Sequence, residues 1–351
     1  MNAPDRAAIR LTQFSHGGGC GCKIAPAALA QMLAKAAPGI VPPALLVGVD
    51  TGDDAAVYQV NATQAIVATT DFFMPIVDDA FDFGAIAATN ALSDVYAMGG
   101  TPLFALALVG MPLDKLPMEV VRRILEGGES ICARAGIPVA GGHTIDSVEP
   151  IYGLAAIGLV DPRHLKRNAG ARPGDVLVLG KPLGVGIYSA ALKKVQLAEE
   201  RYRVLRDSAT QLNTPGIALG GIEGVHALTD VTGFGLLGHL LGMCRASGVG
   251  AALSFERIPL HPGALELARA GFVTGASGRN WASYGGEVAL EASIDEARRA
   301  LLTDPQTSGG LLAAVSPDAV PSVLAVFRDQ GFAHAAPIGE CLGGVPRVRV
   351  R

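Results

Sequence analysis

A polar break at residues 161–175, DPRHLKRNAGARPGD, divides the chain into two halves that each mix strand-like and helix-like segments. Proline, glycine and basic residues gather in this break, which is typical of a boundary between domains. In the first half, helical segments at about 83–98 and 117–135 are each followed by glycine, the usual residue just past a helix. Because 351 residues exceed what one ordinary hydrophobic core supports, the pattern predicts two mixed α/β domains.

The segments within each half are predicted from short apolar runs. In the first half, the predicted strands are AAVYQV, QAIVATTDFF, PLFALALVG, IPVAGG and IYGLAAIGLV, and a short helix is expected over about 26–36. In the second half, DVLVLG, EVALEA, GGLLAAV and RVRV predict strands, whereas GVGIYSAALKK, GFGLLGHLLGMCRA and the regions 295–302 and 317–330 predict helices. The expected organisation is a mobile glycine-rich loop over 1–25, a domain over 26–160, a linker over 161–175 and a domain over 176–351.

Charge and hydropathy exclude several classes of protein. The net charge of −4 gives no basic footprint for nucleic acid. No stretch reaches the roughly 18 uninterrupted apolar residues of a membrane span, and the N-terminus lacks the apolar run of a secretory signal. The five cysteines are an odd number, so thiols in a reducing, cytoplasmic location are expected.

Nine aspartates lie between Lys35 and Lys115, in a span with no lysine, arginine, histidine or glutamate. They are Asp50, Asp53, Asp54, Asp71, Asp78, Asp79, Asp82, Asp94 and Asp114. Carboxylates without local cations repel one another unless something outside the span neutralises them. Hard divalent cations prefer oxygen ligands, and Mg²⁺ favours a few carboxylates together with substrate phosphates. The set therefore favours a metal–phosphate site, although any single aspartate could be exposed or satisfied by a backbone donor.

Two of these carboxylate positions are especially informative. Asn90 and Asp94 are four residues apart on the 83–98 helix, so they share one face of an otherwise apolar helix. A carboxylate there is costly if it has no partner. In the second half, Asp230 precedes a glycine-rich helix start, where an aspartate can contribute to an anion-binding or metal site or simply cap the helix.

Common nucleotide-binding motifs are missing. The chain has no GxxxxGK[ST] loop and no protein-kinase signature, and Gly184-Val-Gly186 matches only part of the dinucleotide fingerprint. An ATP site in this chain must use another architecture. The segment GGHT at 141–144 is a candidate nucleotide contact, with a simple turn as the alternative.

The segment HGGGCGCK, residues 16–23, places two thiols, an imidazole and an ammonium within eight residues. A Cys-x-Cys pair can bind metal, but a structural zinc site needs four ligands, and a disulfide here would be strained. A third interpretation, favoured over these two, is a nucleophilic thiol, whose ionised fraction a nearby lysine can raise. The glycines would let such a loop open and close over a substrate.

The motif LTQFSHGGGCGCKI resembles the N-terminal signature of the selenophosphate synthetase (selenide, water dikinase) family. The similarity continues in order through TGDDAAVY, TTDFFMPIVDD, FDFGAIAATNALSDVYAMGG, AGGHTID, LTDVTGFGLLGH and DPQTSGG. It covers most of the chain, and its wider relatives are synthetases of the aminoimidazole-ribonucleotide-synthetase type. The resemblance implies that architecture and the synthesis of selenophosphate, orthophosphate and AMP from ATP, selenide and water, which supplies selenium for selenocysteine and for selenium-modified tRNA.

The same resemblance implies site residues by position. Cys20 and Lys23 would be catalytic, and Asp54, Asp94 and Asp230 would bind Mg²⁺. The implied nucleotide contacts are Lys23, Thr51, Gly52, Asp53, Asp71, Asp94, Gly142, His143 and Thr144. A homodimer with the nucleotide near the subunit interface, potassium dependence without an assigned site, and a selenium-delivery protein as partner are also implied.

Two other functions stay open at this point. One is a related synthetase that acts on a carbon–nitrogen substrate, although such chemistry does not need an N-terminal thiol. The other is a metal or selenium carrier without turnover, although a carrier has no need of a carboxylate clamp for a triphosphate. The loop departs from the family pattern only in its GGG before Cys20, where relatives often have a small non-glycine residue.

Overall fold

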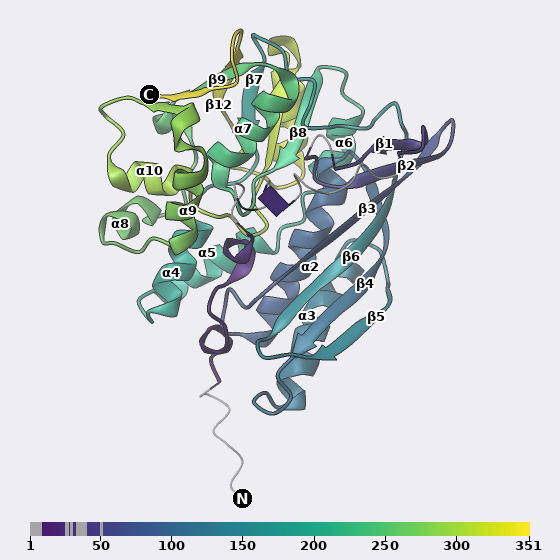
Figure 1. Ribbon diagram of the computed structural model, residues 1–351, viewed down its shortest axis with the longest axis vertical. Coiled ribbons are helices and arrows are strands. Elements are labelled where there is room, and N and C mark those ends of the chain that lie inside the picture. The colour runs from purple at the N-terminus through teal and green to yellow at the C-terminus, as the bar shows by residue number, and fades with distance from the viewer. Residues whose placement is uncertain (1–8, 25–27, 29–30, 33–40, 50–51) are drawn as a thin grey trace, which may run out of the picture.

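The structure, a computed structural model, describes residues 9–24, 28, 31–32, 41–49 and 52–351 (Figure 1). Thr51 and Asp50, and most of the helix expected over 26–36, lie outside the described residues. The described part contains two sheets, each with helices packed against it, and the N-terminal segment runs between them (Figure 1). Two mixed α/β domains are therefore confirmed.

The first sheet has six strands in the order β1-β2-β3-β6-β4-β5. All neighbours pair antiparallel except β4 and β5, which are parallel, and β5 forms an edge. Five of these strands match predicted segments, and β1 was missed. Their bounds are β1 Leu45–Val47, β2 Ala56–Asn61, β3 Gln64–Phe73, β4 Thr101–Met111, β5 Val139–Asp146 and β6 Ile151–Val160.

Two long helices, α2 (Ala80–Ala97) and α3 (Met118–Arg134), pack together beside this sheet. Helix α2 begins three residues earlier than predicted because the Asp79 carboxylate accepts a hydrogen bond from the Asp82 amide. Its nearly uniform burial has a simple cause: α2 contacts β3 and β6 on one side and β8, α5 and α6 of the second half on the other. Gly84 allows the close approach of α3, because a β-carbon there would collide with the Ile124 carbonyl.

The second sheet has seven strands in the order β10-β13-β9-β12-β7-β11-β8. Its strands are β7 Val176–Leu179, β8 Val225–Asp230, β9 Gly250–Leu253, β10 Val288–Leu290, β11 Leu311–Val315, β12 Ala336–Leu342 and β13 Val348–Val350. Its helices are α4 Val185–Lys193, α5 Glu199–Ala209, α6 Pro215–Gly220, α7 Gly235–Ser247, α8 Ala264–Arg269, α9 Gly275–Tyr284, α10 Glu296–Leu302 and α11 Val320–Asp329. The strands β8, β9 and β12 and the helices α5, α6, α8 and α9 were not predicted.

Residues 161–175 contain no helix or strand and connect β6 to β7. They are nevertheless held in place: the Asn168 amide donates to Asp53, and Lys166 donates to the carbonyls of Ile222 and Val225. The domain limits assigned from the sequence stay a prediction. No helix in the described part of the chain is long and apolar enough to cross a membrane.

The N-terminal segment is docked against both halves. It contains two short 3-10 turns, η2 (Leu11–Phe14) and η3 (Gly19–Cys22). Asp78, just before α2, accepts hydrogen bonds from Arg10 and Thr12. The Gly19 amide donates to the Met74 carbonyl. In the second half, the Leu192 carbonyl accepts from Arg10, and Lys193 donates to the Ser15 carbonyl. The segment is therefore positioned where the two halves meet, and its mobility stays a prediction.

Candidate functional site

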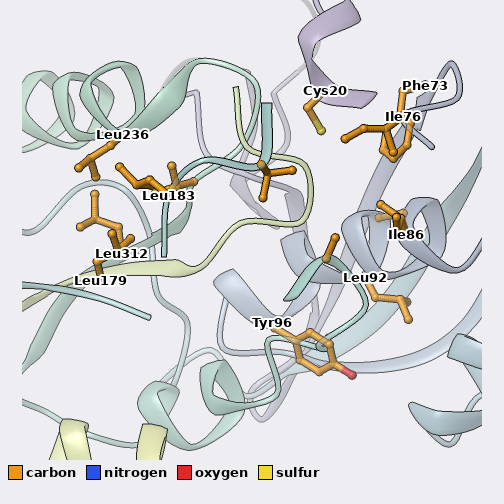
Figure 2. Close-up of a cluster of buried hydrophobic side chains, with 14 of the residues drawn as sticks. Cys20, Phe73, Ile76, Ile86, Leu92, Tyr96, Leu179, Leu183, Leu236 and Leu312 are labelled. Atoms are coloured by element: carbon orange, nitrogen blue, oxygen red, sulfur yellow. The ribbon is translucent and has the colours of Figure 1, made fainter. Parts of the chain in front are cut away.

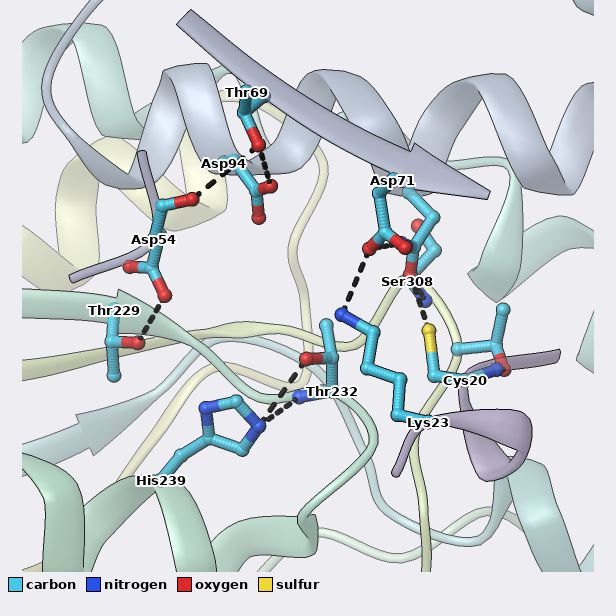
Figure 3. Close-up of polar contacts among 12 residues, drawn as sticks. Cys20, Lys23, Asp54, Thr69, Asp71, Asp94, Thr229, Thr232, His239 and Ser308 are labelled. Carbon is cyan, nitrogen blue, oxygen red and sulfur yellow. Dashed lines mark hydrogen bonds and ion pairs between the residues drawn. The ribbon is translucent and has the colours of Figure 1, made fainter. Parts of the chain in front are cut away.

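Three carboxylates from separate elements meet between the two halves, and Figure 3 shows two of them, Asp54 and Asp94. Asp54 lies just before β2, Asp94 lies on α2, and Asp230 ends β8. One oxygen from each carboxylate lies within 4.8 Å of the others. Because Asp230 ends a strand and α7 is capped without its side chain, the helix-cap interpretation of Asp230 is wrong.

The hydrogen bonds around this triad leave oxygens free. Thr69 donates to Asp94 at 2.6 Å, and Thr229 donates to Asp54 at 2.9 Å. The Oδ2 atoms of Asp54 and Asp230 are buried and have no hydrogen-bond partner in the described part of the chain. A buried polar atom without a partner is costly. Free carboxylate oxygens at this spacing fit a hard divalent cation such as Mg²⁺, which would bind them.

The pKa values of the triad are all raised. Burial is the main cause, and mutual repulsion adds to it: the Asp230 charge raises the pKa of Asp54 and of Asp94 well above the usual value. Burial raises the pKa of Asp230 itself to about 6, although the Ser93 hydroxyl and the Lys23 charge both act to lower this pKa. A cation that binds the carboxylate forms would offset both effects.

The raised pKa values predict how metal-free protein responds to pH. When the pKa of a carboxyl group is higher in the folded than in the unfolded protein, its contribution to stability is fully present at pH values below the unfolded-state pKa. For Asp230, this contribution is lost as the pH rises through its folded-state pKa of about 6. After treatment with EDTA, the melting temperature should be lower at pH 8 than at pH 5.5, and Mg²⁺ should raise it by more at pH 8. An equal effect of Mg²⁺ at both pH values, measured by scanning fluorimetry, would remove the triad as the metal site.

Lys23 reaches the same place from the N-terminal segment. Its ammonium lies 3.0 Å from Asp71 Oδ2, and Asp71, on β3, is only 5% exposed. Burial alone would lower the pKa of Lys23, but the Asp71 carboxylate outweighs it and raises that pKa above its usual value. Lys23 is therefore a fixed positive charge beside the carboxylate triad.

Cys20 is buried at 1% exposure, in a core cluster that also contains Ile76 and Phe73 (Figure 2). Its thiol donates to Asn90 Oδ1 at 3.1 Å, and its amide donates to Thr307 Oγ1 at 3.0 Å. Burial, followed by the Asp71 charge, raises the pKa of Cys20, and Lys23 opposes them less strongly. Lys23 thus acts in the expected direction, but burial and the Asp71 charge outweigh it, so the pKa of Cys20 lies above its usual value in this conformation.

Asn90 connects the loop to both halves of the molecule. Its Oδ1 accepts from the Cys20 thiol and from the Ser308 amide, and its Nδ2 donates to Asp71 at 2.6 Å. The shared face of Asn90 and Asp94 is confirmed, and that face points into the site. The helical spacing predicts the position of Asn90 but not its part in holding Cys20.

The segment DPQTSGG, residues 304–310, holds the loop, because Thr307 accepts from the Cys20 amide. Ser308 has a positive φ of 53°, which few residues other than glycine adopt. The buried Lys181 donates to the Ser308 carbonyl at 2.8 Å and to the Gln211 carbonyl at 2.7 Å. A lysine with two carbonyl partners and no carboxylate gives no local sequence signal, so its role here could be found only in the fold.

A cavity of about 670 Å³ contains Lys23, Asp71 and the triad. Its lining also includes residues of the second half, namely Asn168, Thr232, Phe234, Gly238, His239, Gly242, Arg245, Ser283 and Tyr284. Burial lowers the pKa of His239 to about 3, with a smaller contribution from Lys23, and its Nε2 accepts from the Thr232 amide. The neutral imidazole stacks on Phe234. The cavity therefore combines an acidic wall with one that carries aromatic side chains and a single arginine, Arg245.

The other predicted nucleotide contacts fall into two groups. Gly52 and Asp53 line the same cavity as the triad, and Gly52 has a positive φ of 61°. Gly142, His143 and Thr144 do not line it: they are exposed on the edge strand β5 and border a separate cavity of about 230 Å³. Within the described residues, the structure therefore does not bring GGHT to the carboxylate triad.

The nine aspartates do not act as one set. Asp78 pairs with Arg10, Asp79 caps α2, and Asp82 accepts from Tyr202. Asp54 and Asp94 alone among the described aspartates of that span belong to the triad, and Asp230 completes it from the second half. All five cysteines are free thiols, and Cys22 is the only one of them that is not buried.

Comparison with known proteins gives a consistent result over the whole chain. A family model described as "AIR synthase related protein, N-terminal domain" matches residues 52–160, and its C-terminal counterpart matches residues 172–351. A protein of Dechloromonas aromatica (strain RCB) described as "Selenide, water dikinase" is 64% identical over 342 residues, covering 97% of this chain and 98% of that protein. A protein of Pseudomonas straminea with the same description is 63% identical, covering 98% of this chain and 97% of its own.

Solved structures share the fold at low sequence identity. Thiamine-monophosphate kinase from Stenotrophomonas maltophilia K279a has a TM-score of 0.63 at 22% identity, covering 88% of this chain and 91% of its own. A chain of the HypE–HypF complex has a TM-score of 0.66 at 18% identity, covering 93% of this chain and 96% of its own. These likenesses support the two-domain architecture.

Proposed function

The chain belongs to the selenide, water dikinase family, and on that premise we propose that the cavity between its two halves is the catalytic centre. The family reaction converts ATP, selenide and water to selenophosphate, orthophosphate and AMP. In our proposal Cys20 and Lys23 are catalytic, and Asp54, Asp94 and Asp230 bind Mg²⁺. The observation that carries the proposal is a fixed ammonium and a carboxylate triad that line one cavity. The buried Cys20 thiol is held next to this cavity, because it donates to Asn90, which in turn donates to the lining residue Asp71.

Phosphoryl transfer needs positioning and charge neutralisation more than covalent chemistry from the protein. Mg²⁺, when bound by the triad, would neutralise phosphate oxygens and orient the triphosphate. Lys23 adds a positive charge that Asp71 holds in place. Asn90 and Thr307 hold Cys20 beside this group, where it contacts or guides selenide. Because the loop covers the site, it also limits the access of water to selenide and to ADP.

Nucleotide contacts are proposed for the residues that the family similarity marks. Thr51, Gly52, Asp53 and Asp71, together with Lys23 and Asp94, would contact the phosphates or ribose. Gly52 is suited to a close approach because no atom lies within 4 Å of the place a β-carbon would take. Potassium dependence is part of the same proposal, without an assigned site.

A homodimer would explain the position of GGHT. The face of the first sheet turned away from α2 carries exposed apolar side chains, among them Tyr58, Ile66, Phe72 and Leu106. A contiguous exposed apolar surface of this kind is typical of an interaction site. We propose that two copies pair through this face, so that Gly142, His143 and Thr144 on β5 contact the nucleotide of the partner subunit.

The dimer proposal predicts a sharp effect of charge on this face. The double substitution Ile66→Glu and Phe72→Glu should convert a dimer into a monomer, because two carboxylates would be buried in the interface. Sedimentation velocity measures the change, and Leu113→Glu, at an exposed apolar residue outside the sheet face, is the matched control. A double variant that sediments like the wild type would contradict this interface.

The activity itself can be tested by phosphorus NMR. Purified protein is incubated anaerobically with ATP, Mg²⁺ and selenide. AMP, orthophosphate and a selenophosphate resonance should appear together and only with selenide. ADP as the final product would favour a related synthetase instead, and binding without turnover would favour a carrier.

The cellular location of the protein and the source of its selenide belong to the same proposal. A reducing, cytoplasmic setting suits a chain whose five cysteines are all free thiols and whose Cys20 must stay reduced. A selenium-delivery protein would limit the concentration of free selenide. The product would serve the synthesis of selenocysteine and of selenium-modified tRNA.

A further inference from the structure

A second cavity, of about 430 Å³, shares the N-terminal segment as a wall with the carboxylate cavity but has no lining residue in common with it. The backbone of Gly17, Gly18 and Gly21 forms part of its lining. Most of the side chains around it come from α4 and from the start of α9, and the N-terminal segment adds Thr12 and His16. Cys20, on the 3-10 turn η3, stands in the chain between the lining residues Gly18 and Gly21, so the same loop forms a wall of this space and holds the thiol.

The cavity has a marked positive charge. His16, Lys193, Lys194 and Arg279 line it, and no carboxylate does. Lys193 donates to the Ser15 carbonyl at 3.1 Å, and Arg279 donates to the Gly21 carbonyl at 3.1 Å. Neither forms an ion pair in the described part of the chain. These two cations are therefore held against the loop by backbone oxygens, and their charges remain available to a ligand.

The remaining charges are partly engaged. Lys194 lies 5.3 Å from the centre of the Phe272 ring, and His16 pairs with Glu149 at 2.9 Å. Helix α9 begins at Gly275 in the cavity wall, and the amides of a first helical turn favour anions. The excess positive charge thus comes mainly from Lys193 and Arg279.

Access to Cys20 from the other side is electrostatically unfavourable for an anion. Cys20 is 1% exposed. The carboxylate cavity is lined by more carboxylates than cations: Asp53, Asp54, Asp71, Asp94 and Asp230 against Lys23 and Arg245. The triphosphate of a bound nucleotide would add further negative charge there. Selenide at neutral pH is the hydroselenide anion, so it would meet repulsion from the nucleotide side and attraction from the basic cavity.

We propose that the basic cavity, lined by Lys193, Arg279, His16 and the loop glycines, binds the hydroselenide anion before the loop passes it to Cys20. This inference rests on the proposed function of the Cys20 site. It separates the entry of the two substrates: nucleotide and metal enter at the carboxylate triad, and the small anion enters behind the loop. No covalent step is required at this cavity.

The kinetic test uses Lys193→Gln and Arg279→Gln, singly and together. Each should raise the KM for selenide, by about five- to tenfold in the double variant, because local anion concentration follows the field. The kcat and the KM for ATP should stay near the wild-type values. Arg328→Gln, which changes an exposed arginine on α11 paired with Asp329, is the control. An unchanged KM for selenide, or a loss of kcat that the conservative variants Lys193→Arg and Arg279→Lys do not restore, would overturn the proposal.

A second measurement needs no catalysis. Cys22 is the single cysteine that is not buried, and its sulfur lies 2.8 Å from where a β-carbon of the lining residue Gly17 would stand. Its alkylation by anionic iodoacetate and by neutral iodoacetamide can be followed by mass spectrometry. The rate with iodoacetate divided by the rate with iodoacetamide should be about fivefold lower in the double variant than in the wild type. In the wild type, this ratio should also fall when the salt concentration is raised to about 0.5 M. An unchanged ratio would show that the cavity does not concentrate anions. A failure of the proposed function would appear in a different measurement, as the absence of selenophosphate formation by the wild type.

Discussion

Replacing Cys20 with serine is expected to abolish selenophosphate formation while Mg²⁺–nucleotide binding stays nearly unchanged. The serine hydroxyl is close in size to the thiol and can keep the hydrogen bond to Asn90 Oδ1. It cannot match the nucleophilicity of sulfur. The expected loss of rate is about a thousandfold or more, as for removal of a group that acts directly on the reacting atoms.

Selenide-dependent AMP and selenophosphate formation measures the loss, and calorimetric titration with a non-hydrolysable ATP analogue measures nucleotide binding. The matched control is Cys22→Ser, which makes the same change two residues along the same turn at a thiol that does not contact Asn90. Cys22→Ser should retain most activity. If Cys20→Ser kept normal synthesis, Cys20 would have only a structural part in the loop.

The fold was largely predictable where strands and helices are long. β3, β4, β6, α2 and α3 were all found from apolar runs and from glycines at their ends. Shorter elements were missed for physical reasons: β12 contains proline and glycine, and α5 has few apolar residues to give a clear period. Such elements are stabilised by tertiary contacts, and local pattern cannot reveal them.

The candidate site was predictable in part. Asp54 and Asp94 stood out because their span has no cation, but the same argument wrongly grouped them with Asp78, which Arg10 neutralises from outside the span. Asp230 was implied by family similarity, and only the fold brings it within 4.8 Å of the other two. Lys181 acts through backbone carbonyls, so its residue type and position gave no signal.

Replacing Asp54 with asparagine is expected to have opposite effects on binding and on stability. The substitution removes one charged oxygen ligand, so Mg²⁺-dependent nucleotide affinity should fall by about a hundredfold. It also removes a buried carboxylate that is repelled by Asp230 and Asp94. The Oδ2 atom of this carboxylate has no hydrogen-bond partner in the described part of the chain. Metal-free protein should therefore melt a few degrees higher than the wild type at pH 8.

The opposite signs distinguish a metal ligand from a merely structural carboxylate. A structural aspartate would lose stability and affinity together when it is replaced. Asp114→Asn, in the same cation-free span but exposed, should change neither quantity. Thr229→Val should give a smaller loss of affinity than Asp54→Asn, because it removes only the hydroxyl that orients Asp54. Unchanged nucleotide affinity in Asp54→Asn would remove this residue from the metal site, and a lower melting temperature without metal would contradict the repulsion inferred for the triad.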